Sequence, residues 1–404
     1  MKNKKEVKFR HRCVIKFARI VVKPILVNKW KYTYKKCDEL GKKQPFLVIA
    51  NHSIDLDPLF IQLSFKKALY FVGSEQLLKK SFKASLLKWA VNPIGKKKAV
   101  ADMDCVRKIN KIVKEGGSIC IMPEGNCTYS GSMSNINDSI AKLVKMLKIP
   151  LVIFKINGFY FQRPRWSATK KKGPGHGEVS EIIYPEEIAN MRVEEIYERI
   201  MKAFEKDVYD YQDEHKLIYK GKDLALGLER LGFMCLKCGS FNMKTKNDRL
   251  YCADCADEHR YTNQGYLVDR LEVEMSLKEF ETRVKNSLIN YLNGPTTFEF
   301  KDEVKIYDTS GNKNIFMGKG MFIIKRDELK IVTHQKIIQL PLHDVIAMSV
   351  YRKDKLLVYL ENDTYVVEFL GMESPYKYLM ISQYYRMAYK DNNKKITIND
   401  LGLE

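Results

Sequence analysis

The chain has 404 residues and a formal net charge of +21, with 70 Lys and Arg residues against 49 Asp and Glu. At roughly 100–200 residues per domain, this length predicts two to four domains and excludes a single small module. A hydrophobic content of 45% excludes an intrinsically disordered chain. The excess of positive charge favours a phosphate-rich partner, either nucleic acid or an anionic membrane surface.

The sequence predicts neither a transmembrane helix nor a secretory signal peptide. The longest unbroken apolar run has five residues, of which 46–50 is one example, whereas a spanning helix needs about 18. The basic N-terminus has no uninterrupted apolar stretch and no small-residue cleavage site. Nine cysteines, four of them clustered, favour a reducing compartment without disulfides. We therefore expect a peripheral or monotopic protein on the cytoplasmic face of the cell membrane.

The first 43 residues hold more than half of the net charge. They contain 15 basic and 3 acidic residues, a local balance of +12. Apolar residues recur there at helical spacing while basic residues occupy another face, until Pro24 ends or kinks the helix. This pattern predicts a basic amphipathic helix. Two interpretations stay open, because such a helix can lie in the headgroup region of an anionic bilayer or pack on the next domain with a solvated basic face.

Short apolar runs alternate with longer amphipathic stretches between residues 45 and 156. This alternation predicts an α/β domain with a mostly parallel sheet covered by helices. A further strand is expected over 177–184 and a helix over 185–214. The strands expected within the α/β segment are 46–50, 69–72, 119–122 and 151–156, and its amphipathic stretches include 106–114 and 140–147.

The pattern changes in the last third of the chain. Val, Ile, Phe and Tyr alternate with polar residues over 297–370, with turn signals between the runs, which predicts mostly antiparallel β-structure. An amphipathic helix is expected over 375–389. A sheet closed by such a helix resembles the pleckstrin-homology-like fold. Its expected role is packing on the preceding domain, with lipid-headgroup binding and partner docking as alternatives.

The segment 45–58 places a polar cluster directly after an apolar strand. Strand ends that adjoin helix starts are where α/β proteins place their chemistry. With a helix after His52, the carboxylate of Asp57 lies about one turn further on and reaches Nδ1 of the imidazole. That bond would fix the tautomer and raise the basicity of Nε2. A His and an Asp at this spacing also arise by chance, so the pair alone is weak evidence.

A second apolar strand, 119–122, ends in Pro123-Glu124-Gly125-Asn126. A His with four residues before an Asp, followed some seventy residues later by a strand and Pro-Glu-Gly, resembles the glycerolipid acyltransferase family, typified by 1-acyl-sn-glycerol-3-phosphate acyltransferase. The runs 93–98 and 149–153 resemble two further blocks of that family. The resemblance covers about 43–213. The Glu-Gly-Asn variant and the later Pro-Arg-Trp stretch are similar to a bacterial subset with a trailing zinc ribbon.

The resemblance implies roles for individual residues. His52 would be the general base that takes a proton from the acceptor hydroxyl, and Asp57 would orient it. No covalent nucleophile is needed, because a thioester is already an activated acyl donor. Glu124 and Gly125 would shape the acceptor site. Asn51 is a residue that the family often has before its His, although it could merely cap the turn.

Two neighbouring positions depart from the family pattern. Asn126 and Cys127 stand where the commoner sequence is Thr-Arg, and that Arg is thought to hold the acceptor phosphate. We keep Asn126 among the candidate substrate-binding residues. The residues that could supply the missing charge are Lys96, Lys97, Lys98, Arg163 and Arg165. A lysine offers a point charge and less geometric selectivity than an arginine. The alternative interpretation of the three consecutive lysines is a solvated loop.

The four clustered cysteines form two Cys-x-x-Cys pairs separated by thirteen residues, Cys235 with Cys238 and Cys252 with Cys255. This is the spacing of a zinc ribbon, and four sulfur ligands leave no open position on the ion. We therefore expect a structural zinc, with His259 outside the ligand set.

Together these patterns predict four parts: a membrane-associating segment at 1–43, an acyltransferase domain at 44–215, a connector with the zinc ribbon at 216–265 and a β-rich module at 266–404. The expected reaction moves a fatty acyl group from acyl-CoA or acyl-carrier protein to the hydroxyl of a lysophospholipid, above all 1-acyl-sn-glycerol-3-phosphate, giving phosphatidic acid. Two alternatives remain. One is a zinc-ribbon protein that binds nucleic acid, against which the intact His52 and Asp57 pair argues. The other is a lipid-binding adaptor with a non-catalytic domain, which the departure at Cys127 favours.

Overall fold

The computed structural model describes residues 5–40, 44–79, 81–96, 102–133, 136–295, 297–311, 313–334 and 336–390. The chain divides into two compact units. The first comprises Met1–Pro164 with Lys172–Tyr219, and the second comprises Arg165–Lys171 with Lys220–Glu404. In the part of the chain that is described, no helix is both long enough and apolar enough to cross a membrane.

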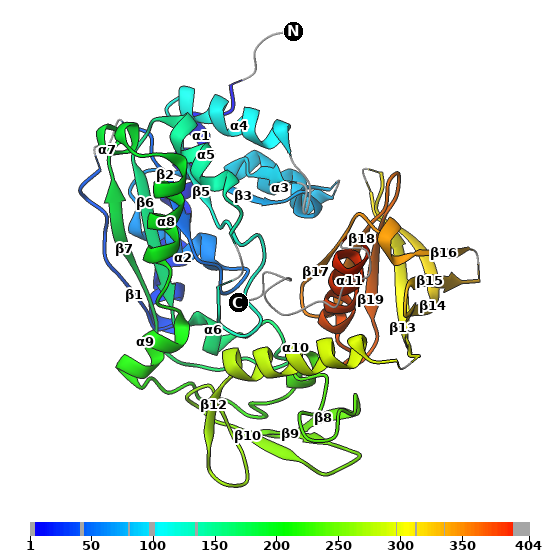
Figure 1. Cartoon of the computed structure of the whole chain (residues 1–404). Helices are drawn as coiled ribbons and strands as arrows, with labels where there is room; N and C mark the ends of the chain where they lie inside the picture. The colour runs from blue at the N-terminus through cyan, green and yellow to red at the C-terminus, as the bar shows by residue number, and fades with distance from the viewer. Residues whose placement is uncertain are drawn as a thin grey trace. The chain divides into compact units, whose positions relative to one another are not determined.

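A seven-stranded sheet forms the centre of the first unit, in the order β1-β7-β6-β2-β5-β3-β4 (Figure 1). Among these described strands all neighbours run parallel except β6 and β7. The sheet is therefore mostly parallel, as the alternation of strands and helices predicts. The strands are β1 (Tyr32–Tyr34), β2 (Leu47–Ala50), β3 (Leu69–Ser74), β4 (Ile94–Lys96), β5 (Ser118–Ile121), β6 (Leu151–Asn157) and β7 (Gly175–Ile183).

Apolar side chains of the central strands alternate between two cores, as the two-residue period of a strand requires. Leu47 and Ile49 belong to the core that includes α4, α5 and α8, whereas Val48 and Ala50 belong to the core that includes α2. The sheet is thus covered on both faces. The helices of this unit are α1 (Phe9–Pro24), α2 (Asp57–Ser64), α3 (Phe82–Val91), α4 (Met103–Lys114), α5 (Ser139–Leu147), α6 (Phe159–Gln162), α7 (Pro185–Asn190), α8 (Val193–Ala203) and α9 (Val208–His215).

The helix expected over 185–214 is divided into α7, α8 and α9. Met191 has an extended backbone after α7. α8 begins after Arg192, whose backbone N–H and Nε both donate to the carboxylate of Glu195. Asp207 begins α9, because its carboxylate accepts the backbone N–H groups at the start of that helix. The hydrophobic period predicted one helix, but residues that begin and end helices divide the segment into three.

The second unit holds two antiparallel sheets. The first has the order β12-β11-β10-β9-β8, and the second has the order β16-β15-β14-β13-β19-β18-β17. α10 (Leu277–Asn293) connects the two in sequence, and α11 (Pro375–Lys390) follows the last strand. The strands are β8 (Met243–Lys246), β9 (Arg249–Cys252), β10 (Glu258–Tyr261), β11 (Tyr266–Val268), β12 (Glu274–Ser276), β13 (Glu299–Asp308), β14 (Ile315–Lys325), β15 (Glu328–Thr333), β16 (Ile337–Pro341), β17 (Ala347–Tyr351), β18 (Lys355–Tyr359) and β19 (Thr364–Phe369).

This architecture confirms the predicted fold class. A mostly parallel α/β unit is followed by a four-cysteine segment and by an antiparallel sheet that ends in a helix. α10 was not among the expected elements. Its buried side chains recur at helical spacing, as Phe280, Val284 and Leu288 illustrate, so a period of 3.6 residues could have revealed it.

Candidate active site

His52 lies in the turn between the end of β2 and the start of α2. Its Nδ1 is 2.9 Å from Oδ2 of Asp57. The same carboxylate oxygen accepts the backbone N–H groups of Ser53, at 2.6 Å, and Ile54, at 2.9 Å. The Asp57 side chain is fully buried and that of His52 is 16% exposed. The carboxylate is therefore held rigidly by three donors, and Nε2 of His52 is the ring atom that remains to take a proton.

The surroundings of His52 make it a strong base. Burial alone lowers the pKa of the imidazole, but the Cys127 sulfur and the Asp57 carboxylate favour its charged form, and together they raise the His52 pKa well above its ordinary value. Burial raises the pKa of the Asp57 carboxyl group, although the bonds from His52 and from two backbone N–H groups oppose that rise. The pair can thus stabilise an imidazolium once a proton has been taken.

The turn after β5 is bonded directly to the turn that carries His52. Oε1 of Glu124 accepts the backbone N–H of His52 at 2.9 Å, and the backbone N–H of Thr128 donates to the His52 carbonyl at 3.0 Å. Gly125 between them has a φ of +67°, a conformation that glycine adopts without strain. Two motifs 72 residues apart in sequence therefore form one structure, in which Glu124 positions the backbone of His52.

Cys127 is brought against the imidazole. Its Sγ is 3.4 Å from Nε2 and 3.8 Å from Nδ1 of His52, and it lies 3.7 Å from a carboxylate oxygen of Asp55. Because the two distances to the ring are so similar, the sulfur lies against the face of the ring and not in line with Nε2. Asp55 is exposed and precedes α2, which begins at Asp57. The sequence singled out Cys127 only as a departure from a family pattern, and its contact with His52 is a finding of the structure.

Asn51 joins two neighbouring strands. Its side-chain amide donates to the carbonyl of Ile156 and its side-chain oxygen accepts the N–H of the same residue, both at 2.8 Å. These two bonds link the residue that follows β2 to the backbone near the end of β6, in addition to the bonds of the sheet. Asn126 follows Gly125 in the turn after β5 and is partly buried.

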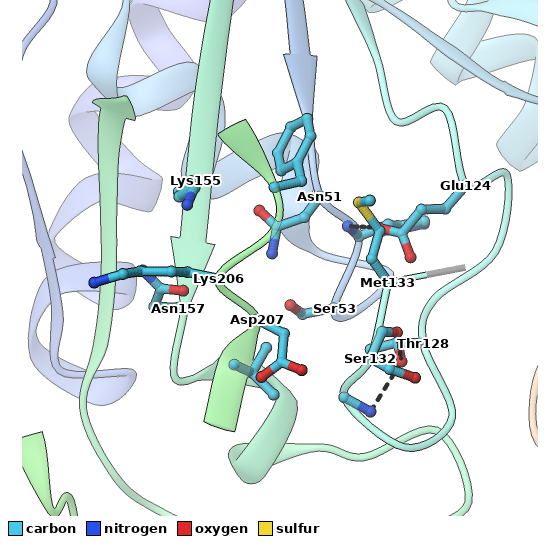
Figure 2. Close-up of a pocket in the computed structure, with 14 residues that line it drawn as sticks. Asn51, Ser53, Glu124, Thr128, Ser132, Met133, Lys155, Asn157, Lys206 and Asp207 are labelled. Carbon is cyan, nitrogen blue, oxygen red and sulfur yellow. Dashed lines mark hydrogen bonds between the residues drawn. The ribbon is translucent and has the colours of Figure 1, made fainter. Parts of the chain in front are cut away.

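His52 is one of the residues that line an open pocket of about 380 Å³, a volume that includes open solvent. Figure 2 shows other residues of this lining, Lys155, Asn157 and Glu124 among them. The sequence had not indicated the wall that β6 contributes, nor Lys206 and Asp207 from the segment between α8 and α9. The lining residues are Asn51, His52, Ser53, Glu124, Thr128, Gly131, Ser132, Met133, Lys155, Asn157, Phe204, Lys206, Asp207 and Val208.

Comparison with known proteins bears on this site. The profile of a protein family described as Acyltransferase matches residues 31–156, which include both motif turns. The chain carries an acyltransferase-family domain. This match confirms the family that the two motifs predicted, and it agrees with the predicted enzyme class, an O-acyltransferase.

Among solved structures, the crystal structure of the 1-acyl-sn-glycerophosphate (LPA) acyltransferase PlsC from Thermotoga maritima is similar to the chain. The two share 16% sequence identity with a TM-score of 0.39, over 48% of this chain and 77% of that one. No curated protein matches.

The basic residues that were candidates for phosphate binding are dispersed. Lys96 is the exposed last residue of β4, whereas Lys97 and Lys98 lie outside the described residues. The Arg163 guanidinium lies 5.7 Å from the centre of the Trp30 ring in the acyltransferase unit. Arg165 belongs to the second unit and donates to the carbonyls of Val350 and Arg352. Of these candidates, none that the structure describes lines the pocket around His52.

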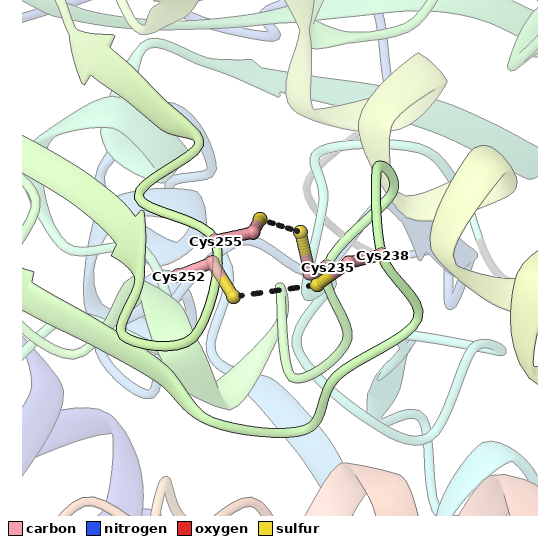
Figure 3. Close-up of side chains that lie close together, drawn as sticks. All are labelled: Cys235, Cys238, Cys252 and Cys255. Atoms are coloured by element: carbon pink, nitrogen blue, oxygen red, sulfur yellow. Dashed lines mark hydrogen bonds between the residues drawn. The ribbon is translucent and has the colours of Figure 1, made fainter.

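The four clustered cysteines lie together in the second unit (Figure 3). Sγ of Cys235 is 3.7 Å from that of Cys255, and Sγ of Cys238 is 3.7 Å from that of Cys252. All four sulfurs lie within 4.8 Å of one another. Sulfurs about 2.3 Å from a zinc ion at tetrahedral corners are about 3.8 Å apart, so these positions fit one metal ion. His259 is not a member of this group among the described residues, and its Nε2 lies 3.4 Å from Asp257.

Proposed function

We propose that the protein transfers a fatty acyl group from an acyl thioester to the free hydroxyl of a lysophospholipid. The observation that carries this proposal is the imidazole of His52, bonded through Nδ1 to buried Asp57 inside the family-matched segment and lining an open pocket. The donor is acyl-CoA or acyl-carrier protein. The acceptor we favour is 1-acyl-sn-glycerol-3-phosphate, which gives phosphatidic acid.

In the proposed reaction, Nε2 of His52 takes the proton of the acceptor hydroxyl while its oxygen attacks the thioester carbonyl carbon. The carbon–sulfur bond then breaks, and the departing thiolate receives the proton from His52. Asp57 holds the ring in the required tautomer and stabilises the imidazolium that forms. Glu124 acts through the backbone of His52 and is a positioning residue.

A surface formed by two helices of the first unit supports association with a membrane. Phe9 and Phe17 of α1 are 80% and 70% exposed, and Phe82 and Trp89 of α3 are 84% and 52% exposed. The two helices contact each other, because Nε of Arg10 donates to the carbonyl of Trp89 at 3.0 Å. We call this surface the α1–α3 face. Exposed rings beside basic side chains are the combination that binds the interface of an anionic bilayer, where lysophospholipids reside.

Zinc is the ion we propose for the four cysteines, because a closed set of four thiolates is characteristic of structural zinc. The ion would join the turn that carries Cys235 and Cys238 to the end of β9. Its role would be to stabilise the second unit, since no coordination position remains for a substrate.

The proposal is tested by measuring thiol release from acyl-CoA and acyl-carrier protein with a panel of lysolipids in anionic vesicles. His52→Ala should abolish transfer while zinc content and circular dichroism match the wild type. His215→Ala removes a histidine outside the pocket, at the end of α9, and should leave transfer unchanged. Full activity of a folded His52→Ala variant would overturn the mechanism, and lysolipid binding without thioester consumption would favour the adaptor alternative.

A further inference from the structure

One wall of the pocket presents two polar side chains on a single face of β6. Lys155 and Asn157 are two positions apart, so they point to the same side of the strand, while the fully buried Phe154 and Ile156 point to the other. The Lys155 side chain is partly buried, and the Asn157 side chain is only 9% exposed. Both line the pocket that contains His52 (Figure 2).

Neither side chain is used within the fold. Among the described residues, the Lys155 ammonium makes no hydrogen bond or ion pair, and no partner bonds the side-chain amide of Asn157. Lys206 lines the same pocket but differs, since its Nζ lies 3.0 Å from a carboxylate oxygen of Glu214. The fold therefore keeps two donor groups available at this wall.

The charges around Lys155 indicate what would satisfy it. Burial, and then the positive charge of Lys206, lower the pKa of Lys155, whereas the carboxylates of Asp210, Glu178 and Glu214 act in the opposite direction. Lowering prevails, so an anion that approached the ammonium would favour its charged form. The carboxylates in the same pocket are already engaged. Glu124 accepts the backbone N–H of His52, and Asp207 accepts the N–H groups that begin α9.

We propose that Lys155 and Asn157 bind the phosphate group of the acceptor lysophospholipid. This inference rests on the proposed function. An ammonium and an amide together offer a point charge and directed N–H donors, which suit the oxygens of a phosphate. They would supply from β6 the charge that is absent at Cys127. The pair defines the acceptor as a phosphate-bearing glycerolipid rather than a neutral one.

The test compares acceptors with and without phosphate. Rates are measured in vesicles of fixed composition with 1-acyl-glycerol-3-phosphate or monoacylglycerol, for the wild type, Lys155→Met, Lys155→Arg and Asn157→Ala. Lys155→Met should raise KM for the phosphate acceptor by about tenfold or more, because charge-assisted bonds are strong. Asn157→Ala should raise it less, and Lys155→Arg should retain most of the affinity. KM for monoacylglycerol should not change.

Lys142→Met is the matched control, since it removes one positive charge of α5 that lies outside the pocket lining and that Asp138 already pairs at 2.7 Å. It should leave KM for the phosphate acceptor within about twofold of the wild type, as expected for an exposed ion pair. An unchanged KM in both Lys155→Met and Asn157→Ala would overturn the inference. An increase confined to KM for acyl-CoA would also overturn it, because the pair would then bind the phosphates of the donor.

A direct binding measurement separates this inference from the proposed function. Glycerol 3-phosphate, titrated into the wild type by calorimetry, should bind and should bind measurably more weakly to Lys155→Met. If the wild type transfers no acyl group to any acceptor, the proposed function fails. If the wild type transfers acyl groups yet Lys155→Met binds glycerol 3-phosphate as well as the wild type does, only the inference fails.

Discussion

Two walls of the same pocket differ in how their polar groups are used. At the turn that carries His52, the groups that position the imidazole are bonded within the protein. Oδ2 of Asp57 accepts three donors and Glu124 accepts the backbone N–H of His52, while the buried Oδ1 of Asp57 and Oγ of Ser53 have no partner among the described residues. At the wall formed by β6, Lys155 and Asn157 have no such partners among the described residues. Bonded groups are pre-oriented for proton transfer, whereas unbonded groups form their hydrogen bonds only when a ligand binds. The difference separates a region suited to chemistry from a region suited to recognition.

Asp57→Asn should have the largest effect on activity among the variants that test this difference between the two walls. The amide cannot hold the ring in the same tautomer or stabilise the imidazolium, so kcat should fall by about 10³–10⁴-fold with little change in KM. Thiol release at saturating acceptor measures this, and circular dichroism checks the fold. A loss confined to KM would mean that Asp57 belongs to the recognition wall instead.

Glu124 tests whether positioning through the backbone matters. Glu124→Ala leaves the N–H of His52 without its acceptor and should lower kcat by roughly 10–100-fold, the value of a bond to a charged group. Glu124→Gln keeps an oxygen at the same place and should recover most of that loss. Equal activity of the two variants would show that Glu124 does not act through this bond.

Lys171 extends the comparison to a buried lysine in the second unit. Its ammonium lies 4.8 Å from the ring of Trp166 and 5.3 Å from that of Tyr261, and burial lowers its pKa to about 7. Charging it in the folded state therefore costs stability below pH 7, and this cost fades as the pH rises towards 10, where the unfolded chain loses the same proton. Lys171→Met should raise the free energy of unfolding by roughly 3 kcal/mol at pH 7.

Urea unfolding of the zinc-loaded protein at several pH values measures the effect of Lys171→Met. The stability difference from the wild type should shrink between pH 7 and pH 10. A difference that grows over this interval would contradict the assignment of the charge cost to Lys171.

Cys127→Ala should give the smallest effect. The sulfur helps to hold the His52 pKa above its ordinary value, so its removal lowers that pKa. Because a general base must be neutral to act, activity rises with pH through the His52 pKa, and the half-point of kcat/KM should move to lower pH. Cys13→Ala, which changes an exposed cysteine of α1, should leave the half-point in place. A shift to higher pH would contradict the prediction.

Local sequence patterns were sufficient for part of this molecule. Short segments of sequence were enough to predict the strand before His52 and the strand before Glu124. The spacing of the four cysteines likewise predicted that they lie together. The wall formed by β6 could not be predicted in this way. It faces His52 because β6 is the neighbour of β2 in the sheet, and strand order depends on contacts about a hundred residues apart.

Some signals were present and were missed. Lys155 and Asn157 interrupt an otherwise apolar strand at alternate positions, which is the pattern of a polar face at a strand end. The contact of Cys127 with His52 and the engagement of Arg165 in the second unit depend on tertiary structure. A basic residue near a motif in sequence was therefore a poor guide to a basic residue near it in space.

The two bonds between Asn51 and Ile156 have a consequence for regiochemistry. They tie the strand that precedes His52 to the strand that carries Lys155 and Asn157, so the span between the base and the phosphate wall is fixed. A fixed distance between two binding groups selects substrates whose own groups are the same distance apart. If the phosphate of a lysolipid binds at Lys155 as proposed, the hydroxyl that reaches Nε2 would be the one whose distance from the phosphate matches that span, so positional isomers would be distinguished by this distance.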